Sequence, residues 1–199
     1  MNFLVNLYLS EQKKDRIIGN FILQVIRKHD LNRYDKDIID AMNYYDDTLN
    51  FIYSHPAFVQ SMNRLNPKMR KSGKMIISIF YDHFLAANWN AYSVLPMKEY
   101  IQQCNNTLLE NQDILPYKIN HNLPELLNSP ILNQIHTVGG LHAYMIELTR
   151  IIKVNIIHEG ALNDLMTNYS AFKEDFNSLM EDLLIYTHSN RELMAVNVA

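Results

Sequence analysis

Apolar residues recur three or four positions apart along most of this chain, a spacing that places side chains on one face of an α-helix. Residues 11–28 put Ile17 and Phe21 on such a face, and residues 36–53 continue the pattern. Residues 74–91, KMIISIFYDHFLAANWNA, are the most apolar segment of this kind. The spacing therefore favours helices over strands.

The glycine content supports the same conclusion, since the chain has only 5 glycines in 199 residues. Sheet proteins and phosphate-binding loops both use glycine where the backbone turns tightly or approaches another group. Neither GxGxxG nor GxxxxGK[ST] is present, so the common nucleotide-binding loops are absent. Pro56, Pro67 and Pro96 are expected to open new segments, because proline suits the first helical turn and restricts the residue before it.

The last third of the chain predicts two long helices, over residues 131–156 and residues 160–188. Gly139–Gly140 and Gly160 are expected to break the helical pattern there. No repeat, low-complexity tract or linker divides the sequence. We therefore expect an all-α fold, a helical bundle that forms a single domain over residues 1–199.

The composition excludes several classes of function. The formal net charge of −3 argues against nucleic acid as the main partner. The single cysteine, Cys104, permits no intramolecular disulfide and no multi-cysteine zinc site, and no neighbouring base or cation activates it. The apolar runs are too short for a membrane span, and the first ten residues do not resemble a signal peptide. We expect a cytoplasmic protein.

One local stretch carries charge of a single sign. Residues 64–74, RLNPKMRKSGK, contain five basic residues and no acidic residue: Arg64, Lys68, Arg70, Lys71 and Lys74. Such runs are usually solvated surface. The alternative interpretation is a docking surface for an acidic partner.

Asp82 and His83 are adjacent within the most apolar segment, YDHFLAANW, where a buried carboxylate needs a metal, a cation or several hydrogen-bond donors. Their structural interpretation is a hydrogen-bonded pair that holds helices together. Their functional interpretation is part of a metal or acid–base site. His29–Asp30 lies at an expected helix end in a charged context, where a metal site is not favoured.

Five segments together resemble the acyl carrier protein phosphodiesterase family: MNFLVNLYLS, IIGNFI, SHPAF, IFYDHFLAANWNAYS and NQDILP. The resemblance runs from residue 1 to about residue 125, and more loosely to about residue 188. It implies an all-α fold similar to the HD-domain metal hydrolases. It also implies removal of 4′-phosphopantetheine from holo acyl carrier protein, assisted by Mn²⁺ or Mg²⁺.

This chain departs from the family pattern at the polar positions. The family begins MNFLAHLYL and continues GNFIADFV, whereas this chain has Asn6 for the histidine and Gln24 for the aspartate. The family signature resembles LHRxIDxFTDSHP, and this chain reads YYDDTLNFIYSHP. The histidine, the arginine and the two aspartates of that signature are replaced by Tyr45, Asp46, Leu49 and Tyr53. Asn20, His55–Pro56, Asp82 and His83 remain.

These replacements remove charged and imidazole groups that a hard divalent cation needs. We therefore expect no metal ligands and no cofactor in this chain. By the resemblance, MNFLVNLYL and YDHFLAANW form opposite walls of the ancestral pocket. The residues expected around it are Asp82, His83, Tyr45 and Asp46 in the catalytic positions, with Asn6, Asn20, Gln24 and Asn43 beside them.

The leading hypothesis is a catalytically degenerate family member that binds an acidic acyl carrier protein or its phosphopantetheine-linked acyl chain, using residues 64–74. A second hypothesis is a metal-free enzyme acting on a carrier-bound chain, with Asp82 or His83 as base and Tyr45 as donor. A third is residual phosphodiesterase activity through Asp46, Asp47 and Asp82. A fourth is an interaction scaffold without a carrier protein.

Overall fold

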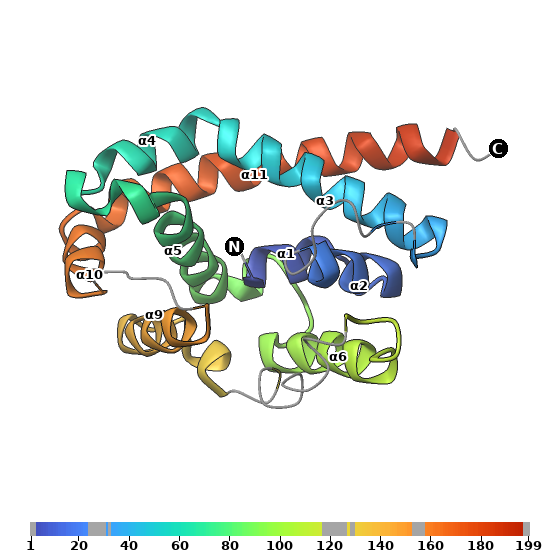
Figure 1. Cartoon of the computed structure of the whole chain (residues 1–199). Helices are drawn as coiled ribbons and strands as arrows, with labels where there is room; N and C mark the ends of the chain where they lie inside the picture. Colours follow the sequence, from blue (N-terminus) through green and yellow to red (C-terminus); the bar gives the residue numbers. More distant parts are fainter. Residues whose placement is uncertain are drawn as a thin grey trace.

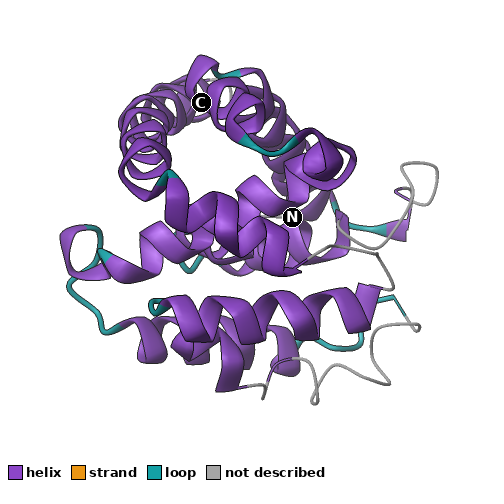
Figure 2. Cartoon of the chain, turned by 90° about the vertical axis from the view of Figure 1, so that its left-hand side faces the viewer, coloured by secondary structure: helices purple, strands orange, loops and turns teal. Residues whose placement is uncertain are grey.

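The computed structural model of the chain describes residues 3–23, 31, 33–116, 127, 130–152 and 158–196, and the regular elements in these ranges are all helical. Figure 2 shows these residues as helices joined by loops. The α-helices are α1 Phe3–Leu9, α2 Lys14–Leu23, α3 Lys36–Ser54, α4 Pro56–Arg64, α5 Gly73–Ala87, α6 Met97–Glu110, α9 Val138–Ile152, α10 His158–Thr167 and α11 Tyr169–Val196. The 3-10 helices η2 Pro67–Ser72, η3 Trp89–Ala91 and η4 Pro130–Gln134 accompany them. The predicted all-α fold is confirmed, and its likeness to HD-domain hydrolases stays a prediction.

Proline marks the helix starts as the sequence predicted. α4 begins at Pro56, η2 begins at Pro67, and Pro96 is the N-cap of α6. The residue before Pro56 also contributes, because the His55 ring accepts a hydrogen bond from the Ala57 N–H, with 3.2 Å between the two nitrogens. A proline in the first turn costs no hydrogen bond, since that N–H has no partner within the helix.

The prediction of one long helix over residues 160–188 is wrong. α10 and α11 meet at Asn168, and Gly160 lies inside α10 without breaking it. The Asn168 Nδ2 donates to the Asp164 carbonyl at 3.2 Å, and the Asn168 carbonyl accepts from the Phe172 N–H at 3.0 Å. One asparagine therefore ends one helix and begins the next, both of which asparagine does readily.

The predicted helix over residues 131–156 also divides, into η4 and α9, and residues 153–156 lie outside the described residues. Gly140 lies in the first turn of α9, where a Cβ atom would stand 1.9 Å from the Gln134 carbonyl oxygen. The glycine is needed because the end of η4 approaches the helix so closely. Residues 24–30, with Gln24 and His29–Asp30, lie outside the described residues, so α2 is described only to Leu23.

α5 is the central helix of the fold. It packs against α1, α4, α9, α11 and η2, and residues 76–86 are buried without exception. In Figure 1, α11 lies along α3 and α4, and α5 runs from this layer toward α9. Neighbours on every side explain why this segment is apolar all round its circumference. They also place Asp82 and His83 in the interior. No described helix is both long enough and apolar enough to span a bilayer.

Candidate functional site

Asp82 caps the first helix from 77 to 79 positions away in the sequence. Its Oδ2 accepts a hydrogen bond from the Phe3 N–H at 2.7 Å, and its Oδ1 accepts one from the Val5 N–H at 2.9 Å. The first N–H groups of a helix have no partner within the helix, and a carboxylate suits the positive end of the helix dipole. Asp82 thereby joins α5 to α1, and the two segments expected to face each other do pack together.

Burial dominates the electrostatics of this carboxyl. Asp82 is fully buried, and burial raises the pKa of its side chain from 3.8 to about 7. The backbone N–H groups of α1 act in the opposite direction, because they stabilise the charged form. The desolvation cost is larger, so the carboxyl titrates near neutral pH.

Asn6 and Tyr45 meet beside Asp82. The Asn6 Nδ2 donates to the Tyr45 hydroxyl at 2.9 Å, and both side chains are buried. The Asn6 Oδ1 is buried and accepts no hydrogen bond from the described residues. Asn20 lies behind this pair and donates to the Asn6 carbonyl at 3.2 Å. α1, α2 and α3 therefore each bring one of these polar residues to the same interior region.

Tyr53 and Ser78 extend this region along α3 and α5. Burial raises the pKa of Tyr53, the nearby Ser78 hydroxyl opposes the rise, and the charge of Asp82 adds to it. The pKa of Tyr45 is raised mainly by burial, and the nearby Tyr53 and Asp82 raise it further. We call Asn6, Tyr45, Tyr53, Ser78 and Asp82 the interior polar cluster. Apart from Asp82 it offers only neutral amide and hydroxyl groups.

Tyr144, from α9, was not among the pocket residues predicted from the sequence. Burial raises its pKa and the Asp82 charge raises it further, so its hydroxyl lies within electrostatic reach of the interior polar cluster. No spacing pattern links α9 to α5, and only the packing of the two helices brings this residue close. Ser78 was also missed, although its position four residues before Asp82 on one helix face was a usable signal.

His83 points away from Asp82 and belongs to a different set of contacts. Its Nδ1 donates to the Ile135 carbonyl at 2.7 Å, so its Nε2 accepts from the Tyr169 hydroxyl at 2.9 Å. Burial lowers its pKa, which keeps the ring neutral and consistent with these contacts. Adjacent residues on a helix point about 100° apart, so Asp82 faces α1 while His83 faces Ile135, which directly follows η4, and Tyr169 at the start of α11.

The other expected pocket residues are placed differently. Asn43 is exposed, because it lies about 200° around α3 from the buried Tyr45. Asp46 is half-buried and contributes to raising the pKa of Tyr45, so it lies near the interior polar cluster. His55 caps α4 and pairs with the exposed Asp182, with 3.0 Å between Nε2 and Oδ2.

The donor set of the interior polar cluster does not fit a divalent metal. Mn²⁺ and Mg²⁺ require several ligands around one point, such as carboxylate oxygens, imidazole nitrogens and water. Here the one carboxylate already accepts two backbone N–H groups, and its neighbours are phenols and amides. Nowhere in the ranges that the structure describes do three His, Cys, Asp or Glu side chains converge.

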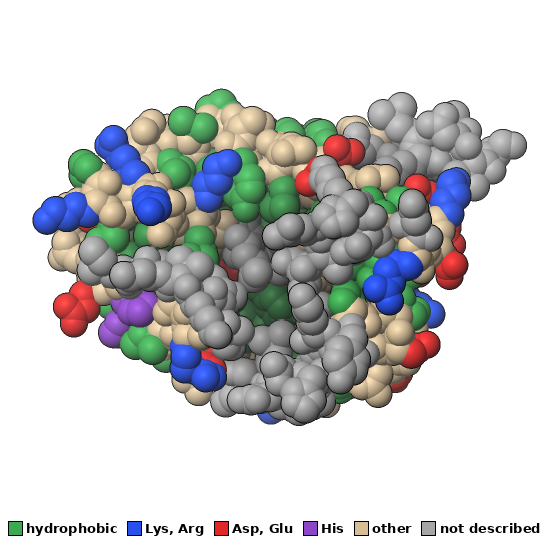
Figure 3. Space-filling view, viewed as in Figure 1, with side chains coloured by type: hydrophobic (Ala, Val, Ile, Leu, Met, Phe, Trp, Pro, Cys, Tyr) green, Lys and Arg blue, Asp and Glu red, His purple; other side chains and the backbone are tan. Residues whose placement is uncertain are grey.

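The basic stretch divides into one half-buried residue, Arg64, which is in an ion pair, and four exposed residues. Arg64 Nε binds the buried Asp175 Oδ2 at 3.0 Å, and the Ser61 hydroxyl donates to the same oxygen at 2.8 Å. Figure 3 shows Lys and Arg side chains gathered over the corner where α4, η2 and α5 meet, at the left of the view. The four exposed residues, which are in no ion pair with a described carboxylate, form what we call the basic surface: Lys68, Arg70, Lys71 and Lys74.

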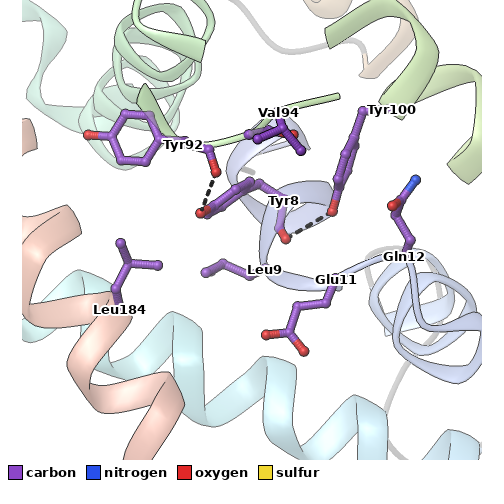
Figure 4. A pocket seen from close by; sticks show the side chains of 9 residues that line it. Tyr8, Leu9, Glu11, Gln12, Tyr92, Val94, Tyr100 and Leu184 are labelled. Atoms are coloured by element: carbon purple, nitrogen blue, oxygen red, sulfur yellow. Dashed lines mark hydrogen bonds between the residues drawn. The ribbon is translucent and has the colours of Figure 1, made fainter. Parts of the chain in front are cut away.

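A separate pocket of about 360 Å³ opens beside the C-terminal end of α1 (Figure 4). The Tyr8 hydroxyl donates to the Tyr92 carbonyl at 3.3 Å, and the Tyr100 hydroxyl donates to the Tyr8 carbonyl at 3.1 Å. These bonds fix the rings as walls. The pocket shares no residue with the interior polar cluster, and its lining consists of Tyr8, Leu9, Glu11, Gln12, Tyr92, Ser93, Val94, Tyr100 and Leu184.

Comparison of the sequence with known proteins places the chain in a family. The profile of the family described as acyl carrier protein phosphodiesterase matches residues 1–183. The chain belongs to the acyl carrier protein phosphodiesterase family. The relatives include a protein named acyl carrier protein phosphodiesterase from Photorhabdus laumondii subsp. laumondii, 24% identical over 90 residues, and one of the same name from Enterobacter sp. (strain 638), 22% identical over 107 residues.

The matches to these two family members are partial. The first covers 45% of this chain and 46% of the relative, and the second covers 53% and 55%. The chain therefore spans about half the length of the curated relatives it matches. No solved structure gives a significant match. The family is established by the profile.

Proposed function

We propose that this chain binds an acyl carrier protein in its holo form and leaves the phosphodiester of the phosphopantetheine arm intact. Membership of the acyl carrier protein phosphodiesterase family supports the choice of partner. The observation that supports the loss of hydrolysis is the donor set of the interior polar cluster, in which Asp82 is the one carboxylate. Both oxygens of this carboxylate hold backbone N–H groups of α1, so it acts as a helix cap and not as a metal ligand. We propose that the chain works without bound Mn²⁺ or Mg²⁺.

The basic surface supports the binding half of the proposal. Carrier proteins are strongly acidic, and the four cations Lys68, Arg70, Lys71 and Lys74 are exposed at one corner of the fold. Charge complementarity of this kind gives orientation and faster association more than raw affinity. Arg64 is excluded from this surface because Asp175 holds its guanidinium.

The contacts of His83 favour binding over the alternative of metal-free catalysis. A general base needs a free nitrogen within reach of the substrate proton. Both ring nitrogens of His83 are used, by the Ile135 carbonyl and the Tyr169 hydroxyl, and the side chain is 1% exposed. If binding is the only function, His83→Ala lowers stability but leaves the affinity of the folded protein for its carrier unchanged.

A titration of fluorescently labelled holo carrier protein tests the docking surface. Arg70→Glu/Lys71→Glu is expected to raise the dissociation constant by about tenfold or more at low ionic strength, with a smaller effect as salt is added. The matched control is Lys14→Glu/Lys98→Glu, which makes the same change in net charge at exposed positions on α2 and α6. Equal weakening by both double variants would contradict a localised dock.

A further inference from the structure

The pocket beside α1 combines aromatic walls with one charged group. Tyr8, Tyr92 and Tyr100 line it, and leucine side chains from α1 and α11 add apolar surface (Figure 4). Among the described residues that line the pocket, Glu11 alone carries a charge at neutral pH. The volume of about 360 Å³ lies at the lower end of the range for small-molecule sites. The pocket is therefore large enough for a compact organic ligand.

The side chains of the pocket walls offer a ligand few hydrogen-bond donors. The Tyr8 hydroxyl donates to the Tyr92 carbonyl at 3.3 Å, and the Tyr100 hydroxyl donates to the Tyr8 carbonyl at 3.1 Å. The Ser93 hydroxyl donates to the backbone carbonyl two residues further on, at 3.2 Å. These groups are committed to the backbone, so the walls present mainly electron-rich rings, and the charged acceptor is the Glu11 carboxylate.

An unusual backbone conformation sets the position of Glu11. Glu11 and Gln12 have φ angles of 53° and 58°, in the left-handed region that costs energy for residues other than glycine. The Glu11 N–H donates to the Tyr8 carbonyl at 3.1 Å, and the Gln12 amide hydrogen-bonds Gln103 on α6. The turn places the Glu11 side chain on the side of the pocket opposite Tyr92 (Figure 4). Strain that neighbouring contacts enforce is often found at ligand sites.

Two cations of the chain already meet the Glu11 carboxylate, and they differ in how firmly they are held. Lys13 Nζ and an Arg16 guanidinium nitrogen each lie 3.1 Å from the Glu11 Oε2. The Arg16 side chain is 14% exposed, and its guanidinium also lies 4.4 Å from the centre of the Tyr44 ring. The Lys13 side chain is 58% exposed, and partial burial together with the charge of Arg16 lowers its pKa. Lys13 is therefore the partner that a ligand can displace.

We propose that this pocket binds a small organic cation, a protonated amine on an aromatic or apolar body, whose ammonium group takes the place of Lys13 at Glu11. The carboxylate and the electron-rich tyrosine rings both attract the ammonium group. The apolar body is buried against Leu9 and the rings. The described lining of the pocket shares no residue with the interior polar cluster or the basic surface, so this inference goes beyond the proposed function and does not depend on it.

Trp89 provides a readout that requires no activity. It is the one tryptophan of the chain, it is 4% exposed, and its ring centre lies 5.9 Å from that of Tyr8 and 5.2 Å from that of Tyr100. Titration with phenethylamine is expected to change the Trp89 fluorescence saturably, with a dissociation constant on the order of 1 mM or lower. Phenethyl alcohol and phenylpropionate, which resemble the amine in shape, are expected to bind at least about tenfold more weakly.

Two variants assign the charge that the ligand meets. Glu11→Gln is expected to raise the dissociation constant for phenethylamine about tenfold or more, whereas Lys13→Gln is expected to lower it, because the competing ammonium group is gone. The matched controls are Glu110→Gln on α6 and Lys14→Gln on α2, which make the same changes of charge at exposed positions outside the pocket. Both controls are expected to stay within about twofold of the unaltered chain.

The outcomes decide between an amine and an anion. Phenethylamine that gives no saturable change, or that binds Glu11→Gln as tightly as the unaltered chain, overturns the inference. Tighter binding of phenylpropionate than of phenethylamine, with weaker binding of both by Lys13→Gln, would show that Lys13 recognises an anion and would overturn it as well. Lys13 is exposed, so Lys13→Gln keeps the test decisive even if circular dichroism shows that Glu11→Gln does not fold.

Discussion

Replacing Asp82 by asparagine changes how the stability of the protein depends on pH. Burial raises the pKa of this carboxyl in the folded protein to about 7, whereas its ordinary value of 3.8 applies to the unfolded chain. The folded state therefore binds the proton more tightly than the unfolded state. The resulting stability is fully present below about pH 3.8 and is lost as the pH rises through 7.

The size of this effect follows from the two pKa values. A shift of about three units corresponds to a free energy on the order of 4 kcal/mol. Asparagine has nearly the same shape and carries no titrating proton, so the difference in unfolding free energy between the unaltered chain and Asp82→Asn isolates this one group. Urea titrations followed by circular dichroism at a series of pH values between 4 and 8 measure that difference.

The expected result is that the unaltered chain loses stability relative to Asp82→Asn as the pH rises from 4 to 8. The opposite trend, with the unaltered chain gaining stability relative to the variant, would show that folding lowers the pKa of Asp82. It would mean that the N–H groups of Phe3 and Val5 stabilise the carboxylate by more than burial disfavours it.

Three other perturbations have defined outcomes. Arg64→Leu leaves the buried Asp175 carboxylate without its cation and should lower the free energy of unfolding by about 2–3 kcal/mol in urea denaturation. Arg70→Leu at the exposed surface should lower it by less than about 0.5 kcal/mol, and equal effects of the two variants would contradict the pairing of Arg64 with Asp175. Tyr45→Phe removes the acceptor of the buried Asn6 amide and should cost about 1–2 kcal/mol in the same assay, and an unchanged midpoint would argue against that hydrogen bond. Cys104 is fully buried and burial raises its pKa to about 12, so a maleimide should label it only as fast as the protein unfolds, and rapid labelling in native buffer would place the thiol at the surface.

The fold was predictable where local signals were strong. The prolines at 56, 67 and 96 marked helix starts, and the apolar run of residues 74–91 indicated the central helix. The division at Asn168 was missed, because asparagine also occurs within helices and nothing in its neighbours reveals that it ends one. Local propensity alone does not decide such boundaries.

The sequence indicated some residues of the site, but it did not indicate what those residues contact. The sequence indicated that Asp82 is buried and needs partners, but the partners are backbone N–H groups 77 and 79 positions away. Likewise, the pairing of Arg64 with Asp175 spans 111 positions. Contacts of this length depend on how helices pack, and residue spacing does not encode them. The position of Ser78 four residues before Asp82 on α5 was visible in the sequence.

The most direct test of the account is the intact mass of a holo acyl carrier protein after incubation with this chain, with and without Mn²⁺. We expect the mass to stay that of the holo form in both conditions, and the carrier to be retained by the immobilised chain. Loss of the phosphopantetheine mass in the presence of Mn²⁺, and not in its absence, would show a working metal-dependent hydrolase and contradict the central claim.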